Sequence, residues 1–174
     1  ISLSEQQLID CSDSYGNAGC SGGLMDSGFE YVRDDHGLCK EESYSYTGHN
    51  DKCNVNCTLF DSITGCVDVP SGNQLALKQA VAQQPVSVAI EADKTIFQFY
   101  SHGVIKYGCG KKLDHGVLIV GYGTDETHGP YWKVKNSWGN KWGDSGYVKI
   151  ARNDSLTDGG VCGIAMQASY PIIE

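Results

Sequence analysis

The sequence has few prolines, few basic residues and no long run of apolar residues. Lys and Arg number 13 against 21 Asp and Glu, so the formal net charge is −8 at pH 7. Nucleic acids and anionic membrane surfaces attract a basic face, so we expect neither as a partner. The longest apolar run, Val117–Val120, is far shorter than the roughly 20 residues of a membrane-spanning helix. The sequence therefore predicts a globular protein without a membrane span.

Signals of targeting and repetition are missing as well. The chain opens with ISLSEQQLID, without an initiator Met or a signal peptide. Ser4 to Gln7 has the spacing of a capping box at the start of a helix. We therefore expect residue 1 to lie inside a domain, as it would in a processed or truncated product.

The 22 glycines against four prolines indicate many turns and close backbone contacts.

Apolar spacing predicts helices in the first part of the chain and strands in the second. Helices are expected from Ser4, from Leu24 to a stop at His36-Gly37, and over Asn73–Gln83, with Leu38–Gly65 as loop. After Pro85 the apolar period becomes two, which is typical of strands separated by glycine turns. The strands are expected at residues 86–90, 103–107, 116–123, 131–136 and 146–150.

Helices followed by strands indicate an α+β protein, and the change of pattern suggests two lobes. We expect residues 1–68 to form a mostly helical lobe and residues 69–174 to form a β-rich lobe.

His115 stands at the head of the apolar stretch LDHGVLIVGYG, where an ionisable ring needs a reason. Asn136 ends the predicted strand YWKVK further along, beside Trp138 and Trp142. An amide that accepts a hydrogen bond from one imidazole nitrogen fixes the tautomer and leaves the other nitrogen free to act as a base. A tryptophan over that pair would exclude water. The alternative is that His115 and both tryptophans are structural and Asn136 is a turn residue, and spacing alone does not choose.

A second candidate nucleophile is Ser145. The stretch GDSGY around it is similar to the GDSGG loop of chymotrypsin-like serine proteases. However, a second glycine is missing, and no early histidine precedes a mid-chain aspartate as that family requires. A serine hydrolase is therefore the weaker alternative.

Eight cysteines indicate disulfides and a secretory or lysosomal setting, although the sequence alone does not determine how they pair. The glycosylation sequons at Asn56 and Asn153 fit the same route. A zinc site is the alternative, because His49, Cys53 and Cys57 recur every four residues and could be joined by Cys39 or Cys66. Paired C-x-x-C knuckles are absent, which disfavours that alternative and a metal in general.

Seven stretches of the chain carry a family resemblance. In order they are SEQQLIDC, GCSGGLMDSGFEYV, ESYSYTG, QPVSVAIEA, LDHGVLIVGYG, YWKVKNSWGNKWGDSGYVKIAR and GVCGIAMQASYP. Together they cover nearly the whole chain, and the sequence resembles papain-like cysteine proteases of the cathepsin L-like branch. The resemblance implies the papain-like two-lobe fold, with an incomplete helical lobe, an antiparallel β-barrel-like lobe and the active site in the cleft between them.

The resemblance makes His115 the catalytic histidine, Asn136 the residue that orients its ring and Trp138 the shield of their hydrogen bond. It places the nucleophilic cysteine after a CGSCW-like motif, upstream of SEQQLIDC, together with the oxyanion-hole glutamine. Neither motif is present. We therefore expect a fragment of a cysteine endopeptidase that is inactive alone and needs no metal or organic cofactor. The alternative is a catalytically dead relative that binds peptides or an inhibitor.

The resemblance also assigns substrate contacts. Gly22 and Gly23 match the segment that pairs with the substrate backbone, and Asp114 matches a position whose main chain meets substrate. The pocket for the second residue before the cut is matched by Met25, Ala89, Leu113 and Gln167. A neutral amide at Gln167 predicts leucine, phenylalanine or valine there rather than arginine, which would lose hydration without gaining a counter-ion.

The expected partners are peptide or protein substrates and protein protease inhibitors, in a lysosome or vacuole or outside the cell. The resemblance implies the disulfides Cys11–Cys53 and Cys109–Cys162, and an unpaired Cys20 whose family partner lies on the missing segment. Three cysteines remain. We favour a Cys39–Cys57 disulfide, with Cys66 as a small buried residue.

Overall fold

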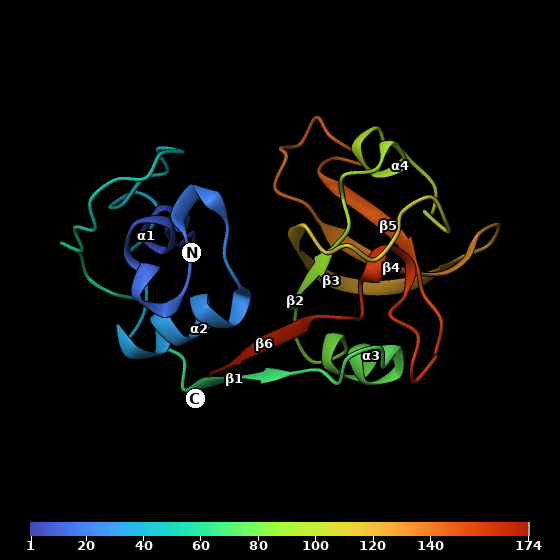
Figure 1. The fold of residues 1–174 in the computed structure, drawn as a ribbon, viewed down its shortest axis with the longest axis horizontal. Coiled ribbons are helices and arrows are strands. Elements are labelled where there is room, and N and C mark those ends of the chain that lie inside the picture. The colour runs from blue at the N-terminus through green and yellow to red at the C-terminus, as the bar shows by residue number, and fades with distance from the viewer. Residues whose placement is uncertain (174) are drawn as a thin grey trace. The chain divides into compact units, whose positions relative to one another are not determined.

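The computed structural model describes residues 1–173, which form two units. One unit comprises Ile1–Val67 together with the residues from Pro171 onward, and the other comprises Asp68–Tyr170. Each unit has its own cluster of buried apolar side chains. Figure 1 labels the elements of both units.

The first unit is built on two short helices, α1 (Glu5–Cys11) and α2 (Met25–Asp34), with single 3-10 turns at residues 13–15 and 19–21. Ser4 caps α1, because its hydroxyl accepts a hydrogen bond from the Gln7 N–H at 3.0 Å. The buried core of this unit is small and consists of Cys11, Tyr31, Val32, Leu38 and Ile63.

Buried amides of α1 compensate for that small core. The Gln7 side chain is fully buried, accepts a hydrogen bond from the Cys39 N–H at 2.7 Å and donates to the Tyr31 hydroxyl at 2.8 Å. The side-chain oxygen Oε1 of Gln6 accepts from the Thr47 N–H at 2.9 Å. Buried amides cost little when their groups are bonded in this way, so they can hold loops that apolar packing does not.

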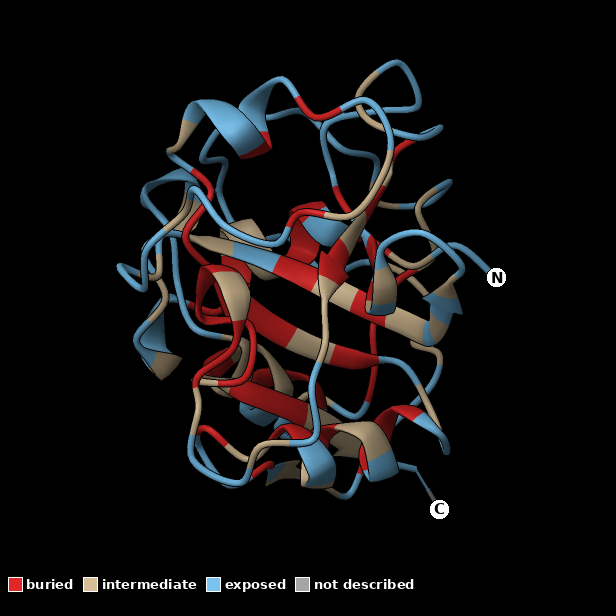
Figure 2. Ribbon diagram, turned by 90° about the vertical axis from the view of Figure 1, so that its right-hand side faces the viewer, coloured by how far each residue is buried: buried red, intermediate tan, exposed pale blue. Residues whose placement is uncertain are grey.

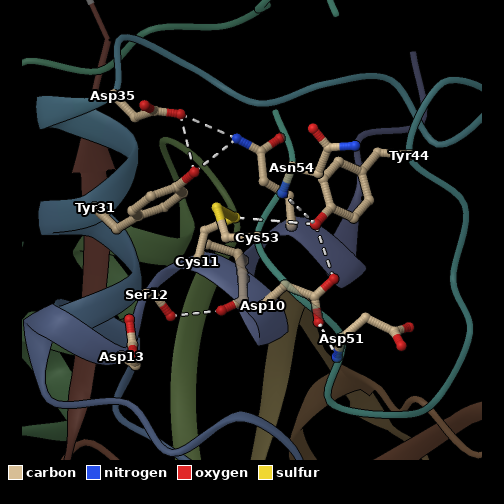
Figure 3. Close-up of a disulfide and its surroundings, with 12 residues drawn as sticks. Asp10, Cys11, Ser12, Asp13, Tyr31, Asp35, Tyr44, Asp51, Cys53 and Asn54 are labelled. Atoms are coloured by element: carbon tan, nitrogen blue, oxygen red, sulfur yellow. Dashed lines mark hydrogen bonds between the residues drawn. A yellow bond between two sulfur atoms is a disulfide. The ribbon is translucent and has the colours of Figure 1, made fainter. Parts of the chain in front are cut away.

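The long loop after Leu38 is fastened to α1 by a disulfide and an acidic side chain (Figure 3). Asp10 accepts hydrogen bonds from the Tyr44 hydroxyl at 2.8 Å and from the Asp51 N–H at 2.9 Å. The Tyr44 hydroxyl in turn lies beside the disulfide between Cys11 and Cys53. The loop therefore keeps a defined course without regular secondary structure.

The strands form one six-stranded sheet in the order β1-β6-β2-β3-β4-β5. The four pairings of β6 with β2, β2 with β3, β3 with β4 and β4 with β5 are all antiparallel. With β1 and β5 at its two ends the sheet is open, not a closed barrel. The strands are β1 (Gly65–Asp68), β2 (Val86–Ile90), β3 (His115–Asp125), β4 (Gly129–Lys135), β5 (Tyr147–Ala151) and β6 (Ala168–Ile172).

The core of the second unit lies against the central strands, whose buried segments stand out in Figure 2. Trp132 and Val134 of β4 are fully buried, as is Ile119 of β3, because alternate residues of a strand face the same side. Helix α3 (Gln74–Val81) adds the fully buried Leu77, and the short α4 (Thr95–Gln98) adds Phe97. A 3-10 turn at residues 161–163 precedes β6.

The predicted α+β class and the three predicted helices are confirmed, as are four of the five predicted strands. The strand predicted at residues 103–107 is wrong. Only Ile105 pairs there, in an isolated bridge to Ile150, and the flanking Gly103 and Gly108 have positive φ angles that turn the chain away. Strands β1 and β6 were not predicted, since neither has a clear apolar alternation.

No helix within residues 1–173 is long and apolar enough to cross a membrane.

Candidate active site

His115 is the first residue of β3, and the antiparallel register places it opposite Ile90, the last residue of β2. Its side chain is half-buried. The strand pairing therefore fixes the backbone of His115, while part of its side chain remains exposed to solvent.

Asn136 follows β4 directly and is buried, with 8 % of its surface exposed. Its Oδ1 lies 2.8 Å from His115 Nε2 and also accepts the Ser137 N–H at 2.8 Å. A backbone N–H can only donate, so the atom facing Ser137 is the amide oxygen rather than the nitrogen. The same oxygen can only accept from His115, and Nε2 therefore carries a proton.

The other ring nitrogen, Nδ1 of His115, has no hydrogen-bond partner within residues 1–173. In the neutral imidazole with a protonated Nε2, Nδ1 holds the lone pair. The pair of His115 and Asn136 thus presents a base with its tautomer set by a buried amide.

Aromatic rings surround the imidazole. The Trp138 ring lies 5.1 Å from that of His115 at an interplanar angle of 34°, and Phe97 lies 6.4 Å away, edge to face. Phe97 also packs edge to face on Trp138 at 5.5 Å. Trp142 joins this cluster and donates its indole N–H to the Gln98 carbonyl at 2.9 Å. These rings pack around the imidazole, and a hydrogen bond with less access to water is electrostatically stronger.

The residues before His115 are held by two acidic side chains. Asp114 accepts the Ala92 N–H at 2.8 Å and donates its own N–H to Ile90 at 2.9 Å. Glu91 is 3 % exposed and accepts the Lys112 N–H at 3.0 Å. The bonds from the Lys112 N–H and from Lys94 hold the pKa of Glu91 below its ordinary value. The start of β3, and with it His115, is therefore tightly placed.

Three of the four predicted pocket residues belong to the same unit as His115. Ala89 donates its N–H to the Gln167 carbonyl at 3.0 Å and pairs with Gly116 on its other side. Gln167, which directly precedes β6, therefore lies beside Ala89 of β2, and Ala89 pairs with Gly116, the residue that follows His115. The Leu113 side chain packs so closely against Gly163 that a Cβ at position 163 would overlap it.

In the other unit, Gly22 and Gly23 differ in how their backbone groups are used. The Gly22 N–H donates to Gly19 at 3.2 Å, and its carbonyl accepts from Ala18 at 2.8 Å. Gly23 is exposed, and its N–H and carbonyl make no hydrogen bond within residues 1–173. Only Gly23 can therefore pair with an extended peptide through both groups. Met25 opens α2 and is half-buried.

The two alternative sites are contradicted. Ser145 is exposed at the tip of the hairpin between Asp144 and Tyr147, with a φ of 54°, and no histidine is bonded to it in the part of the chain described. The zinc hypothesis fails because Cys53 and Cys57 both belong to disulfides, which removes their thiolates.

The structure contains three disulfides, Cys11–Cys53, Cys39–Cys57 and Cys109–Cys162. Cys20 lies outside them, is exposed and directs its thiol at the Gly48 carbonyl at 3.8 Å. Cys66 is a half-buried residue of β1.

Comparison with known proteins decides the family. The model of the family described as papain family cysteine protease matches residues 1–172. The chain belongs to the papain family of cysteine proteases. It is 53 % identical to a cathepsin L-like protein of Caenorhabditis elegans and 52 % identical to cathepsin L of Sarcophaga peregrina. Each match covers 99 % of this papain-family chain and 51 % of the relative, so the chain spans about half the length of these curated relatives.

Solved structures agree with this family. The bromelain protease from Ananas comosus, in complex with the E64 inhibitor, superposes with a TM-score of 0.92 at 39 % identity, over 99 % of this chain and 79 % of that one. The proform of Amb a 11, a ragweed pollen allergen and cysteine protease, gives a TM-score of 0.93 at 43 % identity, over 100 % and 53 % of the respective chains. The papain-like fold and the cathepsin L-like similarity inferred from the sequence motifs are thereby confirmed.

Three residues of this papain-family chain gain importance only from the structure. Ser137 settles the orientation of the Asn136 amide, Phe97 packs beside the His115 ring, and Asn17 binds the Leu24 N–H next to Gly23 at 2.8 Å. The sequence carried one usable signal for Asn17, an asparagine just ahead of a glycine-rich turn, where such side chains often bond to backbone.

Proposed function

We propose that residues 1–174 carry the base and much of the substrate-binding surface of a cysteine endopeptidase whose nucleophilic thiolate lies outside these residues. The observation that carries the proposal is the bond from His115 Nε2 to Asn136 Oδ1, which leaves Nδ1 as the basic nitrogen. Six of the eight cysteines form disulfides, and neither Cys20 nor Cys66 stands in a motif like that of the family's nucleophile.

The proposed reaction is acyl transfer. His115 Nδ1 takes the proton of the thiol, and the thiolate attacks the carbonyl carbon of the scissile peptide bond. The imidazolium then gives that proton to the leaving amine as the C–N bond breaks, and a thioester remains. His115 next removes a proton from water, the resulting hydroxide attacks the thioester, and the C–S bond breaks to release the acid and the thiolate.

Asn136 serves both proton transfers. Its Oδ1 accepts from Nε2 in the neutral ring and in the imidazolium, so the ring keeps one orientation throughout. The bond becomes charge-assisted when the imidazolium forms, which stabilises the charged state that the thiolate needs as its partner. Trp138 and Phe97 keep water away from that bond.

Substrate binding is assigned to backbone and to pocket residues. Gly23 offers a free N–H and a free carbonyl, the pair of groups through which one residue of an extended peptide is held as a strand. Ala89, Leu113 and Gln167 are proposed to line the pocket for the second residue before the cut, and Met25 is proposed as a further substrate-binding residue. Asp114 is proposed to meet substrate through its main chain.

The second candidate is a papain-family protein that binds peptides or a protease inhibitor without cleaving them. Such a protein would have the same residues in the site and would differ only in the nucleophile. In either case we propose a lysosomal, vacuolar or extracellular location, supported by the three disulfides, which persist in oxidising compartments.

The test uses the full-length protein expressed from its own coding sequence and a fluorogenic peptide with leucine two residues before the cut. We expect hydrolysis that a thiol-directed epoxide abolishes and that His115→Ala removes, while residues 1–174 alone neither cleave the peptide nor react with the epoxide. Peptide binding without hydrolysis would favour the second candidate. Epoxide labelling at any of the eight cysteines of residues 1–174 would contradict the proposal.

A further inference from the structure

The residues that lead into α2 contain an asparagine whose side chain bonds to the backbone beside Gly23. Asn17 Oδ1 accepts the Leu24 N–H at 2.8 Å. One residue further along, the Ala18 N–H donates to the Gly22 carbonyl at 2.8 Å. The two peptide groups that flank Gly23 are therefore each bonded on one side to the segment formed by Asn17 and Ala18.

These two bonds determine where the groups of Gly23 point. In a planar trans peptide the carbonyl of one residue and the N–H of the next point in opposite directions. The Gly22 carbonyl faces Ala18, so the Gly23 N–H points away from that segment. The Leu24 N–H faces Asn17, so the Gly23 carbonyl points away as well. Both free groups of Gly23 are thus turned outward, the N–H by Ala18 and the carbonyl by Asn17.

Asn17 is itself held firmly. Its Nδ2 donates to the Ser12 hydroxyl at 2.8 Å, and that hydroxyl donates to the Leu8 carbonyl of α1 at 2.5 Å. Ser12 is fully buried and follows Cys11, the helix residue of the disulfide in Figure 3. Every polar atom of the Asn17 amide therefore has a partner, and the oxygen is the atom that must face Leu24, since an N–H can only donate.

Asn17 and Gly23 are also in close steric contact. A Cβ at position 23 would overlap the Asn17 amide, so only glycine fits beside it. A second asparagine acts at the other end of the turn, where Asn50 Oδ1 accepts the Cys20 N–H at 2.6 Å and leaves room only for glycine at position 19. The glycines and the asparagines of this segment are therefore complementary.

We propose that Asn17 is a positioning residue that aims the Gly23 carbonyl at an N–H of the bound peptide substrate. Asn17 does not touch the substrate; it acts through the peptide group between Gly23 and Leu24. The inference rests on the proposed function, in which Gly23 pairs with substrate backbone, and adds the residue that sets the direction of that pairing.

The test compares two substrates on the full-length protein. One is a peptide, and the other is its depsipeptide analogue, in which an ester oxygen replaces the N–H of the second residue before the cut. Wild type should cleave the peptide with a kcat/KM about 3- to 10-fold above that for the depsipeptide, the effect of one neutral hydrogen bond. In Asn17→Ala the ratio should fall toward one, because the Gly23 carbonyl is no longer aimed.

Two further variants separate positioning from general damage. Asn17→Asp keeps the oxygen acceptor for Leu24 but loses the donor to Ser12, so it should keep more of the ratio than Asn17→Ala, and a folded Asn17→Asp with no more of the ratio than Asn17→Ala would count against the proposal. Asn54→Ala is the matched control, because its side chain is exposed in the same unit and makes no hydrogen bond to any of residues 1–173. An unchanged ratio in a folded Asn17→Ala would overturn the inference.

A readout independent of activity distinguishes this inference from the proposed function. If wild type cleaves neither substrate, the proposed function fails, and the role of Asn17 is read from amide hydrogen exchange at Leu24. Exchange at Leu24 should accelerate in Asn17→Ala and stay slow in Asn17→Asp and Asn54→Ala. Equal exchange in all variants would show that Asn17 does not hold this peptide group.

Discussion

His115 and Asn136 are joined by a hydrogen bond of 2.8 Å between Nε2 and Oδ1, although they are separated by all of β3 and β4. The two strands form one antiparallel hairpin, so its ends bring the two residues together. The same hairpin places the amide oxygen within reach of the Ser137 N–H, which fixes its orientation. The β3–β4 hairpin therefore suffices to define which nitrogen of His115 carries the proton and which is basic.

Removing the Asn136 amide should weaken catalysis. The bond to the His115 imidazolium is charge-assisted, so Asn136→Ala in the full-length protein should lower kcat/KM by about 10- to 150-fold, corresponding to about 1.5–3 kcal/mol. Steady-state kinetics with the leucine substrate measure this. Asn140→Ala, an exposed change in the next loop, is the control and should leave kcat/KM unaltered. An Asn136→Ala enzyme as fast as wild type would remove Asn136 from the mechanism.

The effect of Trp138 on catalysis should depend on an aromatic ring that covers His115 and not on the indole N–H. Trp138→Ala opens one face of the His115–Asn136 bond to water and should reduce kcat/KM about 3- to 10-fold, the size expected when one hydrogen bond loses its protection. Trp138→Phe retains an aromatic face over His115 and should stay within about twofold of wild type, a margin well below the value of one hydrogen bond. The shielding role would be refuted by equal losses in the Phe and Ala variants.

A carboxylate at position 167 should admit arginine to the specificity pocket. Gln167 is half-buried, and its carbonyl is bonded to Ala89 beside the start of β3. In Gln167→Glu a charge-assisted bond of roughly 1.5–3 kcal/mol should raise the ratio of arginine to leucine cleavage about 10- to 150-fold. A substrate library varied at the second residue before the cut measures this ratio.

The control for that change is Gln79→Glu, which introduces the same charge on an exposed position of α3. It should not change the ratio. If Gln167→Glu behaved like Gln79→Glu, or if wild type already cleaved arginine and leucine equally well, Gln167 would not line the pocket.

The hairpin between β3 and β4 should lose stability in acid. His128 and the N–H groups of His128 and Thr127 bond to Asp125 and lower its pKa from 3.8 to about 2. A carboxyl group whose pKa is lowered by folding contributes stability above its unfolded pKa and loses it as the pH falls through the folded value. Asp125→Asn should therefore melt below wild type at pH 6, with a gap that closes between about pH 4 and pH 2.

Thermal melting of both proteins at a series of pH values tests this, and Glu42→Gln, which removes an exposed carboxylate whose ion pair with Lys40 lies at the surface, is the comparison. Surface ion pairs contribute little, so its gap to wild type should be small at every pH. A gap for Asp125→Asn that did not depend on pH would contradict the role of its ionised form.

Much of this molecule was open to prediction because the relevant signals are local. The Ser4 cap and the apolar spacing of α2 and α3 are set by neighbours a few residues away, and the alternation in β2, β3 and β4 shows which side of each strand is buried. His115 and Asn136 could be singled out for the same reason, since each stands at the end of a recognisable strand. The family followed from seven short motifs in order.

Other features depend on contacts between distant residues and were decided by the tertiary structure. The strand expected around Ile105 makes only one bridge, while β1 and β6 form because partners from far along the chain pair with them. The acceptor that reveals the protonated nitrogen of His115 is shared with Ser137, a detail of geometry that spacing does not contain.

Gly22 and Gly23 show the difference most clearly. The sequence by itself determined that two glycines stand where a substrate backbone could pair. The folded turn decided that only Gly23 has free groups, because Ala18 already occupies the Gly22 carbonyl and Asn17 turns the next peptide outward. Hydrogen-bond directions are set by the positions of both partners in space, and only the folded chain brings those partners together.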